Sequence, residues 1–280
     1  MERTVSLFLD PDAGELAIKN DPDEKHRPEI TKREIGDYLV TGTLRGVHYG
    51  SFSGVNAALI VFQFNFHSNG PSPFRYKSAQ IKVTFASSPN TLGVTNVTDE
   101  KPVVCSFYPK QYSGDPTAQE VRSGYGISVP LTTGPLLPVT LGVKAHLARD
   151  TKIVRNHRAT IRGATKSDGA RNHNVVMWKI NENAAEKDGI PHEFHCEVIV
   201  RYPQAEFHAR VDLEFSASTL SVDPRLLFLS GRPWTKDDPI IFDWSNPRGL
   251  ELSLKKLVGV DLSTLSDLEW ESILHPKNIE

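Results

Sequence analysis

Residues 194–201 read Phe-His-Cys-Glu-Val-Ile-Val-Arg, and residues 207–215 read Phe-His-Ala-Arg-Val-Asp-Leu-Glu-Phe. In both stretches an apolar residue stands at every second position. Successive side chains of a strand point to opposite faces, so this period predicts two strands that each have one buried and one exposed face. The Pro-containing segment 202–205 between them predicts a turn and therefore an antiparallel hairpin. This pair of strands indicates a protein built from antiparallel sheets.

The charges on the exposed faces of these two strands predict how the strands pair. One register sets Glu197 opposite Arg210, and a slip by two residues sets it opposite Asp212. Opposite charges across a ladder stabilise a sheet by about 0.2–1 kcal/mol. We therefore expect the first register.

The same alternation occurs in several other segments of the chain. Residues 38–49, 57–67 and 79–85 follow one another as three predicted strands, which favours an antiparallel meander. Residues 139–147 alternate as well; we expect residues 149–152 to turn the chain and residues 153–165 to return beside it.

Two segments do not show this alternation of apolar and polar residues. Residues 87–123 are rich in Pro, Gly, Asn, Asp and Thr, which predicts an irregular connection with one strand inside it and a boundary between two halves. Near the C-terminus, Asp261 or Ser263 is predicted to cap a short helix, because the apolar residues that follow fall at helical spacings. We expect an all-β fold, an antiparallel β-sandwich of two halves (residues 1–132 and 133–280, or one composite domain) with this terminal helix.

The composition places the chain among globular proteins. Its 280 residues include 39% hydrophobic and 24% charged residues, and the formal net charge is −2. A chain of this length buries a sizeable core, and its near-neutral charge gives no global attraction to nucleic acid or to anionic membranes.

The cysteines and the N-terminal region predict where the protein resides. Cys105 and Cys196 are far apart in sequence, and we expect buried free thiols because cysteine behaves as a small hydrophobic residue. The apolar run 5–9 is shorter than the core of a secretory signal. We expect a soluble, cytoplasmic protein.

One region of the sequence is strongly basic. Between Lys144 and Arg171 there are eight lysines and arginines against two aspartates, a local charge of +6. Arginine side chains bind phosphate and carboxylate groups through two parallel hydrogen bonds, so this region predicts a basic hairpin that holds an anionic partner, either phospholipid or nucleic acid. The alternative is that it neutralises the acidic residues of segment 1–24 and of the C-terminal helix. The candidate anion-binding residues are Lys144, Arg149, Lys152, Arg155, Arg158 and Arg162.

Patterns for catalysis and for metal binding are weak. Asp237, Asp238 and Asp243 lie among aromatic residues, a combination found in carbohydrate-processing sites. His195, His208 and Asp212 form a polar ladder rather than a metal site. The sequence has no phosphate-binding loop and no dinucleotide fingerprint, so neither a cofactor nor a metal is expected.

Residues 178–183 (Trp-Lys-Ile-Asn-Glu-Asn) and 187–191 (Lys-Asp-Gly-Ile-Pro), followed by the Val-rich strand that ends at Arg201, carry a resemblance. This pattern resembles one in uncharacterised β-rich proteins of filamentous fungi. The resemblance implies a soluble fungal protein and transfers no site residue. The two-part β layout is also similar to that of arrestin-like proteins.

Three functions remain open at this point. The first is a non-enzymatic binding protein that contacts an anionic partner, or another protein, through the basic region. The second is a hydrolase-like enzyme acting on a carbohydrate through the three aspartates. The third is a self-assembling module in which open sheet edges pair between copies of the chain.

Overall fold

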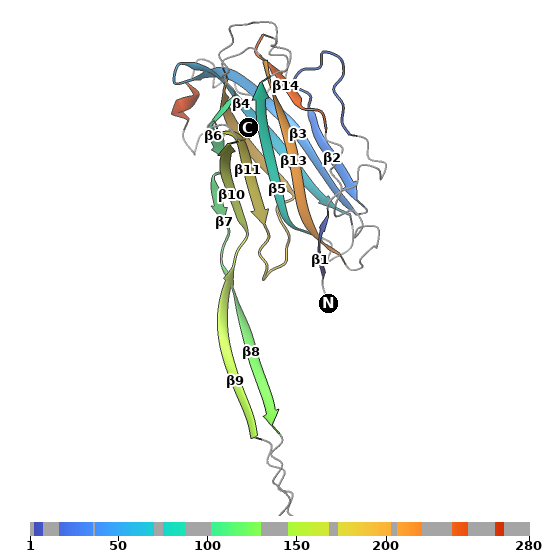
Figure 1. The fold of residues 1–280 in the computed structure, drawn as a ribbon, viewed down its shortest axis with the longest axis vertical. Helices are drawn as coiled ribbons and strands as arrows, with labels where there is room; N and C mark the ends of the chain where they lie inside the picture. Colours follow the sequence, from blue (N-terminus) through green and yellow to red (C-terminus); the bar gives the residue numbers. More distant parts are fainter. Residues whose placement is uncertain are drawn as a thin grey trace, which may run out of the picture.

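The fold consists of two antiparallel sheets packed face to face and a ribbon that extends beyond them (Figure 1). The computed structural model describes residues 3–7, 17–35, 37–69, 75–87, 102–129, 145–167, 173–202, 206–219, 237–245 and 261–265. Within them the all-β class and the sandwich arrangement predicted from sequence alternation are confirmed.

The larger sheet has seven strands. Its order is β1-β13-β5-β11-β10-β7, and β14 pairs with β13. The bounds are β1 Arg3–Leu7, β5 Tyr76–Ser87, β7 Gln111–Ser113, β10 Thr160–Ser167, β11 His173–Asn181, β13 Glu206–Thr219 and β14 Ile240–Asp243.

The smaller sheet has five strands in the order β2-β3-β4-β12-β6. Their bounds are β2 Glu29–Ile35, β3 Tyr38–Phe52, β4 Val55–Ser68, β6 Val103–Tyr108 and β12 Glu193–Arg201. The remaining strands, β8 Thr117–Val129 and β9 Ala145–His157, pair with each other as a two-stranded sheet. We call this two-stranded sheet the ribbon.

The core lies between the two large sheets. Phe62 and Phe64 of β4 face it from the five-stranded sheet, and Ile81, Phe85 and Trp178 face it from the seven-stranded sheet, all fully buried. These residues hold the alternate positions of their strands, so each sheet turns one apolar row inward.

The predicted hairpin of residues 194–215 is wrong in its pairing, although its alternation is right. Strand β12 pairs with β4 and β6 in one sheet, whereas β13 pairs with β5 in the other. Tyr202 and Phe207, on either side of the connection, contact each other with ring centroids 4.7 Å apart. The two strands therefore belong to opposite sheets, and Glu197 and Arg210 are not partners.

The predicted meander is also only partly right. Strands β3 and β4 are antiparallel neighbours, as expected, but β5 belongs to the opposite sheet. The apolar rows of β4 and β5 face each other across the interior instead of lying side by side. An alternating pattern sets which face of a strand is buried, and both arrangements satisfy it.

The middle of the chain differs most from the expectation. Residues 149–152 do not turn the chain, because β9 runs through them and pairs with β8 along its whole length. The segment predicted to be irregular holds β6, β7 and the start of β8 within its described part. Both large sheets contain strands from both sides of residue 132.

At the C-terminal end, Asp261 caps a short 3-10 turn, Leu262–Thr264, by accepting a hydrogen bond from the amide of Ser263. The longer helix predicted after this cap lies outside the described residues. The prediction of free thiols agrees with the structure: Cys196 is buried and Cys105 is half-buried.

The ribbon leaves the sandwich where the chain packs closely against itself. A Cβ atom at Gly163 of β10 would lie 2.6 Å from the ring of Phe107 and 2.6 Å from the carbonyl oxygen of Pro109. The amide of Gly163 donates to the carbonyl of Lys110 at 2.8 Å. Only glycine permits this approach of β10 to the segment that joins β6 and β7.

We expect Gly163→Ala to lower the free energy of unfolding by about 1–3 kcal/mol, because the methyl group displaces backbone as well as side chain. Urea denaturation followed by circular dichroism measures the change. Gly114→Ala is the matched control, since a Cβ atom there would lie 3.7 Å from the Cβ of Ala159, an ordinary contact. Equal stability of the two variants would contradict the assignment.

Candidate functional site

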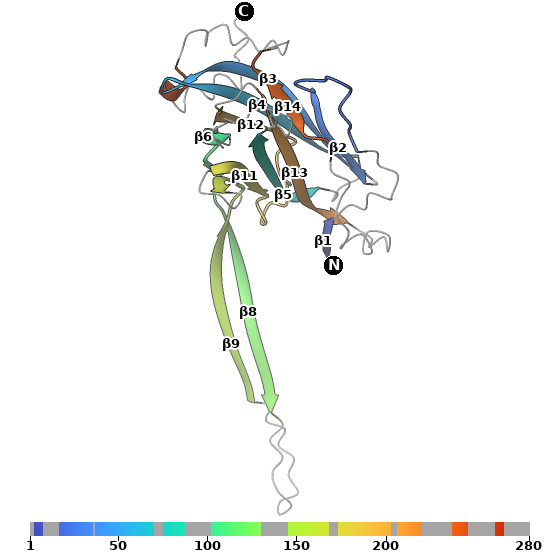
Figure 2. The same ribbon diagram turned by 45° about the horizontal axis from the view of Figure 1, so that its top comes forward.

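The ribbon stands away from the sandwich in both views of the molecule (Figures 1 and 2). Each of its strands has 13 residues, which at about 3.3 Å per residue gives a length of about 40 Å. Among the described strands, β8 and β9 pair only with each other. Within the described chain, the ribbon is therefore the part that projects from the sandwich.

The base of the ribbon is tied to the seven-stranded sheet. The pairing of Ser113 with Thr160 in β7 and β10 precedes the pairing of Thr117 with His157 at the start of the ribbon. The hydroxyl of Thr117 accepts a hydrogen bond from Asn183 at 2.8 Å and donates one to Glu186. These contacts attach the ribbon to the body, so forces on it are transmitted to the sheet.

The register of the ribbon separates its residues into two different faces. Residues opposite each other, and residues two apart along a strand, share a face. One face combines Val121, Tyr125, Ile127 and Val129 of β8 with Ile153, Arg149, Leu147 and Ala145 of β9. The other face combines Glu120, Arg122, Gly124, Gly126 and Ser128 with Val154, Lys152, Asp150, Ala148 and His146. Nearer the body the first face also holds Gln119, Ser123, Thr151 and Arg155, so it is mainly apolar only over residues 125–129 and 145–149. The second face consists mostly of charged, polar or small residues.

The structure distributes the candidate anion-binding residues along the ribbon and its base. Arg149, Lys152 and Arg155 belong to β9. Arg158 is exposed in the connection that follows, and Arg162 is exposed on β10 of the seven-stranded sheet. Lys144 lies outside the described residues.

These basic residues therefore do not form a hairpin or a compact pocket of their own. They follow a line from Arg149 to Arg162, from the ribbon onto the edge region of the sheet. Charges spaced over tens of ångströms lie beyond one screening length of about 8–10 Å from end to end, so they do not converge on one small anion. They suit an extended anionic surface.

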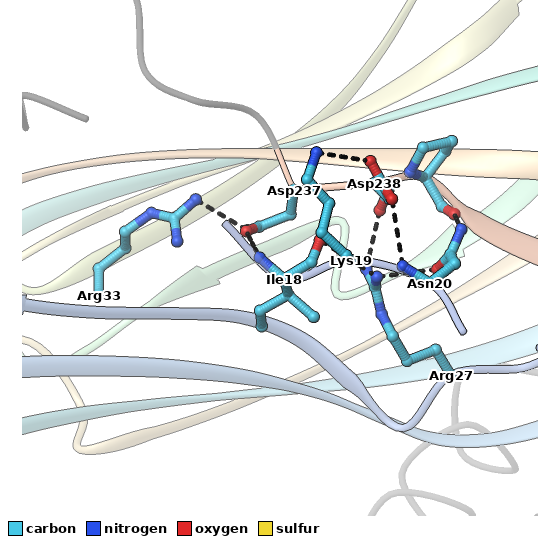
Figure 3. Close-up of polar contacts among 8 residues, drawn as sticks. Ile18, Lys19, Asn20, Arg27, Arg33, Asp237 and Asp238 are labelled. Atoms are coloured by element: carbon cyan, nitrogen blue, oxygen red, sulfur yellow. Dashed lines mark hydrogen bonds and ion pairs between the residues drawn. The ribbon is translucent and has the colours of Figure 1, made fainter. Parts of the chain in front are cut away.

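The aspartates of the hydrolase hypothesis have structural partners. Asp237 forms an ion pair with Arg33 at 2.8 Å, and both side chains are less than 10% exposed (Figure 3). Its other oxygen accepts a hydrogen bond from the amide of Ile18 at 2.8 Å. Asp237 thus fastens the segment that precedes β2 to the segment that precedes β14.

The neighbouring carboxylate acts in the same way. Asp238 accepts hydrogen bonds from the amide of Asn20 at 3.1 Å and from the ammonium of Lys19 at 3.2 Å (Figure 3). Arg27 donates to the Asp238 carbonyl at 2.7 Å. The hydrogen bond from Asn20, followed by the one from Lys19, lowers the pKa of Asp238. The general acid of a carbohydrate-hydrolysing pair needs a raised pKa, so the shift at Asp238 is opposite to what that role requires.

We expect Asp237→Ala to destabilise the fold by about 3 kcal/mol, because it leaves the buried charge of Arg33 without its carboxylate. Asp238→Ala removes a more exposed ion pair and is expected to cost about 1 kcal/mol or less. Thermal unfolding of both variants measures the difference. A larger loss for Asp238→Ala than for Asp237→Ala would contradict this ranking.

The histidine ladder considered in the sequence is divided between the two sheets. His195 is in β12 of one sheet, and His208 and Asp212 are in β13 of the other. His195 contacts Glu193 on its own strand. Among the residues that the structure describes, no group of three or more His, Cys, Asp or Glu side chains is arranged to hold a metal ion.

A buried cluster that the sequence did not indicate surrounds His26. Its Nε2 atom lies 2.6 Å from the hydroxyl of Tyr49, and its ring packs edge-on against Phe242. Burial lowers the pKa of His26, which favours the neutral imidazole. Trp244 packs edge-on against Tyr49 and stays 40% exposed. The cluster fixes the loop before β2 against β14.

Glu197 is the residue that sequence reasoning placed most wrongly. It was expected on an exposed ladder, but it is fully buried between Val61 of β4 and Tyr108 of β6. Neither carboxyl oxygen has a hydrogen-bond partner among the described residues. Loss of solvation raises the pKa of Glu197 to about 9. The folded protein therefore holds this group protonated at neutral pH.

This burial makes stability depend on pH. An unfolded chain releases the Glu197 proton above its ordinary pKa of 4.5, whereas the folded chain keeps it to about 9, so stability falls as pH rises between these values. We expect Glu197→Gln to exceed the wild type by up to about 3 kcal/mol near pH 7, and the difference to vanish near pH 4.

Urea denaturation of the wild type and the variant across this pH range measures the effect. Glu29→Gln, at an exposed position, is the control and should keep the wild-type profile. A pH-independent difference between Glu197→Gln and the wild type would show that the carboxyl is ionised in the folded state.

The fold and the site define an all-β sandwich protein with a projecting two-stranded ribbon. No family model matches the sequence, and no curated protein matches it. Among solved structures, the NetB toxin of Clostridium perfringens in its membrane-inserted form is 13% identical, with 64% of this chain and 85% of that chain covered and a TM-score of 0.21. A score this low says nothing of the function of this chain. In the part of the chain that the structure describes, no helix is long and apolar enough to cross a bilayer.

Proposed function

We propose that this protein is a non-enzymatic binding protein that attaches to anionic phospholipid membranes through its ribbon. The observation that carries the proposal is the mainly apolar end of one ribbon face, at residues 125–129 and 145–149, on a projection outside the sandwich core. The basic residues of β9 lie on the same projection.

The apolar face supports a lipid partner. Apolar surface removed from water contributes about 25 cal/mol per Å². In the sandwich each sheet covers the apolar row of the other, but the ribbon pairs with no third strand among those described. We expect the acyl chains at a membrane surface to contact the face of the ribbon on which Val121, Ile127 and Leu147 lie.

The basic residues support an anionic headgroup layer. Each Lys or Arg near an anionic leaflet contributes about 1 kcal/mol to binding. A membrane is an extended surface, so residues as far apart as Arg149 and Arg158 bind it at the same time. Nucleic acid pairs with the basic residues equally well, but it does not bury the apolar face. Lipid is therefore the preferred partner.

The remaining expectations from sequence stay predictions. A cytoplasmic location is compatible with the proposal, because the cytoplasmic leaflet is the anionic one. The fungal source implied by the sequence resemblance also stays a prediction.

Sedimentation of the full chain with vesicles tests the proposed function. We expect binding to vesicles that contain phosphatidylserine, weaker binding to phosphatidylcholine alone, and a steep decrease with added salt. The triple variant Arg149→Glu, Lys152→Glu, Arg155→Glu should weaken binding by at least about 100-fold, since it removes about three favourable contributions of 1 kcal/mol each.

The matched control carries the same change of charge on the sandwich: Lys32→Glu, Arg45→Glu and Arg210→Glu, all at exposed positions. It should bind vesicles much as the wild type does, and both triple variants should keep the wild-type circular dichroism spectrum. Equal losses in the two variants would show a non-specific charge effect. Binding to a DNA duplex but not to vesicles would replace the lipid with nucleic acid.

A further inference from the structure

We propose that the outer face of the seven-stranded sheet, beside the base of the ribbon, binds the headgroup of a phosphomonoester lipid such as phosphatidic acid. The site is a row of four residues on neighbouring strands: Gln111 of β7, Arg162 of β10, Lys179 of β11 and Gln80 of β5. We call it the cationic row. The inference rests on the proposed function in one respect, because this lipid lies in the membrane that the ribbon contacts.

The register of the sheet sets these four side chains next to one another. Arg162 is paired with Gln111 on one side and with Lys179 on the other, and Lys179 is paired in turn with Gln80. Residues directly opposite each other on one face of a sheet have Cβ atoms about 4.5–5.5 Å apart. The row therefore presents two adjacent cations between two amide groups, over a width of about 14 Å.

The cationic row faces away from the core. Trp178 of β11 and Ile81 of β5, which alternate with members of the row along their strands, are fully buried between the two sheets. Successive side chains of a strand point to opposite faces, so the row lies on the outer surface. Arg162 and Lys179 are both exposed, as is Gln111. A ligand in solution or on a membrane can reach them.

Within the described strands, no acidic residue neutralises the two cations of the row. The nearest acid in the same row is Glu214 of β13, which lies beyond Gln80 and accepts a hydrogen bond from it at 3.1 Å. In the next row, Asp212 forms an ion pair with Lys82 at 3.4 Å. The row on the other side, nearer the ribbon, holds only uncharged residues: Ser113, Thr160, Asn181, Ser78 and Ser216.

The acids of the loop that follows β11 also have other partners. Glu182 forms an ion pair with Arg75 at 2.7 Å, and Glu186 accepts a hydrogen bond from Thr117 at the base of the ribbon. Like charges directly opposite each other in a ladder are unfavourable, and here no neighbouring carboxylate relieves the repulsion. The free protein therefore keeps two adjacent positive charges available to an external anion.

The chemistry of the row favours an anion with two charges in one group. A phosphomonoester carries a charge of about −1.5 to −2 at pH 7, whereas a phosphodiester carries one negative charge. The Arg162 guanidinium can bind two phosphate oxygens side by side, and the Lys179 ammonium acts as a point charge beside them. The amide N–H groups of Gln111 and Gln80 are further donors. One phosphomonoester thus neutralises both cations, which a phosphodiester headgroup does not.

The position of the row suits a membrane that the ribbon also contacts. Figure 1 shows β7, β10 and β11 at the end of the body from which the ribbon leaves. Arg162 follows His157, the first paired residue of the ribbon on this side, by five residues, which at about 3.3 Å per residue is about 17 Å. One membrane surface can therefore contact the ribbon and the row together.

The test compares binding of the full chain to two kinds of vesicle that differ in one chemical group. Phosphatidic acid ends in a phosphomonoester, and phosphatidylmethanol ends in a methyl phosphodiester. The two are used at equal zeta potential, so that the general attraction of a basic protein to a negative surface is the same. We expect the wild type to bind the phosphatidic acid vesicles at least about tenfold more tightly, because one group then neutralises both cations.

The variant Arg162→Gln/Lys179→Gln should reduce this preference to within about twofold. The matched control is Lys166→Gln/Arg210→Gln. It removes two charges from exposed positions of the same outer face, but β11 and β5 lie between these two residues, so they form no adjacent pair. The control should keep a preference of at least about tenfold.

A third variant separates charge from packing. Arg162→Lys/Lys179→Arg keeps both charges and exchanges their side chains, and it should keep the preference to within about threefold of the wild type. Circular dichroism and thermal unfolding check that the three double variants keep the sandwich. Loss of the preference in this variant as complete as in Arg162→Gln/Lys179→Gln would contradict neutralisation by adjacent charges.

A competition experiment tests whether the phosphomonoester belongs to a lipid. The probe is sn-glycerol 3-phosphate, which carries the same group without acyl chains and makes no contact with the ribbon. We expect it to displace the protein from phosphatidic acid vesicles only at concentrations at least about 100-fold above that of the accessible lipid. Displacement at equal concentrations would overturn the assignment to a lipid.

The outcomes separate the inference from the proposed function. Equal binding of the wild type to the two vesicle types would overturn the inference, and binding to phosphatidylserine vesicles would still support the ribbon. A preference that persists in Arg162→Gln/Lys179→Gln, or that the control loses equally, would remove the row as the site. Binding to phosphatidic acid without binding to phosphatidylserine would support the row and count against the ribbon. Weaker binding of Arg162→Gln/Lys179→Gln to a DNA duplex, with its lipid preference unchanged, would replace the lipid with nucleic acid.

Discussion

The structure depends on one constraint: the apolar row of each sheet has to pack against another apolar surface. In the sandwich, the row carried by β4 is covered by the rows of β5 and β11, and Phe64, Phe85 and Trp178 are fully buried as a result. The two sheets are stable only together, because neither has a second apolar layer. The ribbon shows the same alternation over part of its length, and among the described strands it pairs with no other sheet.

Two ionisable groups of the sandwich are buried in different ways. The ion pair of Arg33 with Asp237 joins two segments that are more than 200 residues apart in sequence. Glu197 is buried between strands as a protonated group. Asp237, which the sequence suggests for a catalytic site, is thus paired within the framework of the sandwich.

The ribbon combines three properties that are separately ordinary. It pairs with no third strand among those described, one face is apolar at its far end, and basic residues are spread along β9. The proposed membrane attachment uses the last two. The idea that open edges pair between chains was one of the three functions suggested by the sequence, and the structure gives that idea a definite strand pair on which it can act.

The sequence by itself determined the fold class and most of the buried positions, since alternation follows from the geometry of a single strand: Phe207, Ala209, Leu213 and Phe215 are all buried as predicted. It also indicated the basic residues of the candidate site. Only the tertiary structure decided that β12 and β13 lie in opposite sheets, that Glu197 is covered, and that Arg149 to Arg155 stand on a projecting ribbon. The reason is physical: a local period specifies which way a side chain faces, whereas neighbours are selected by contacts between residues far apart in the chain.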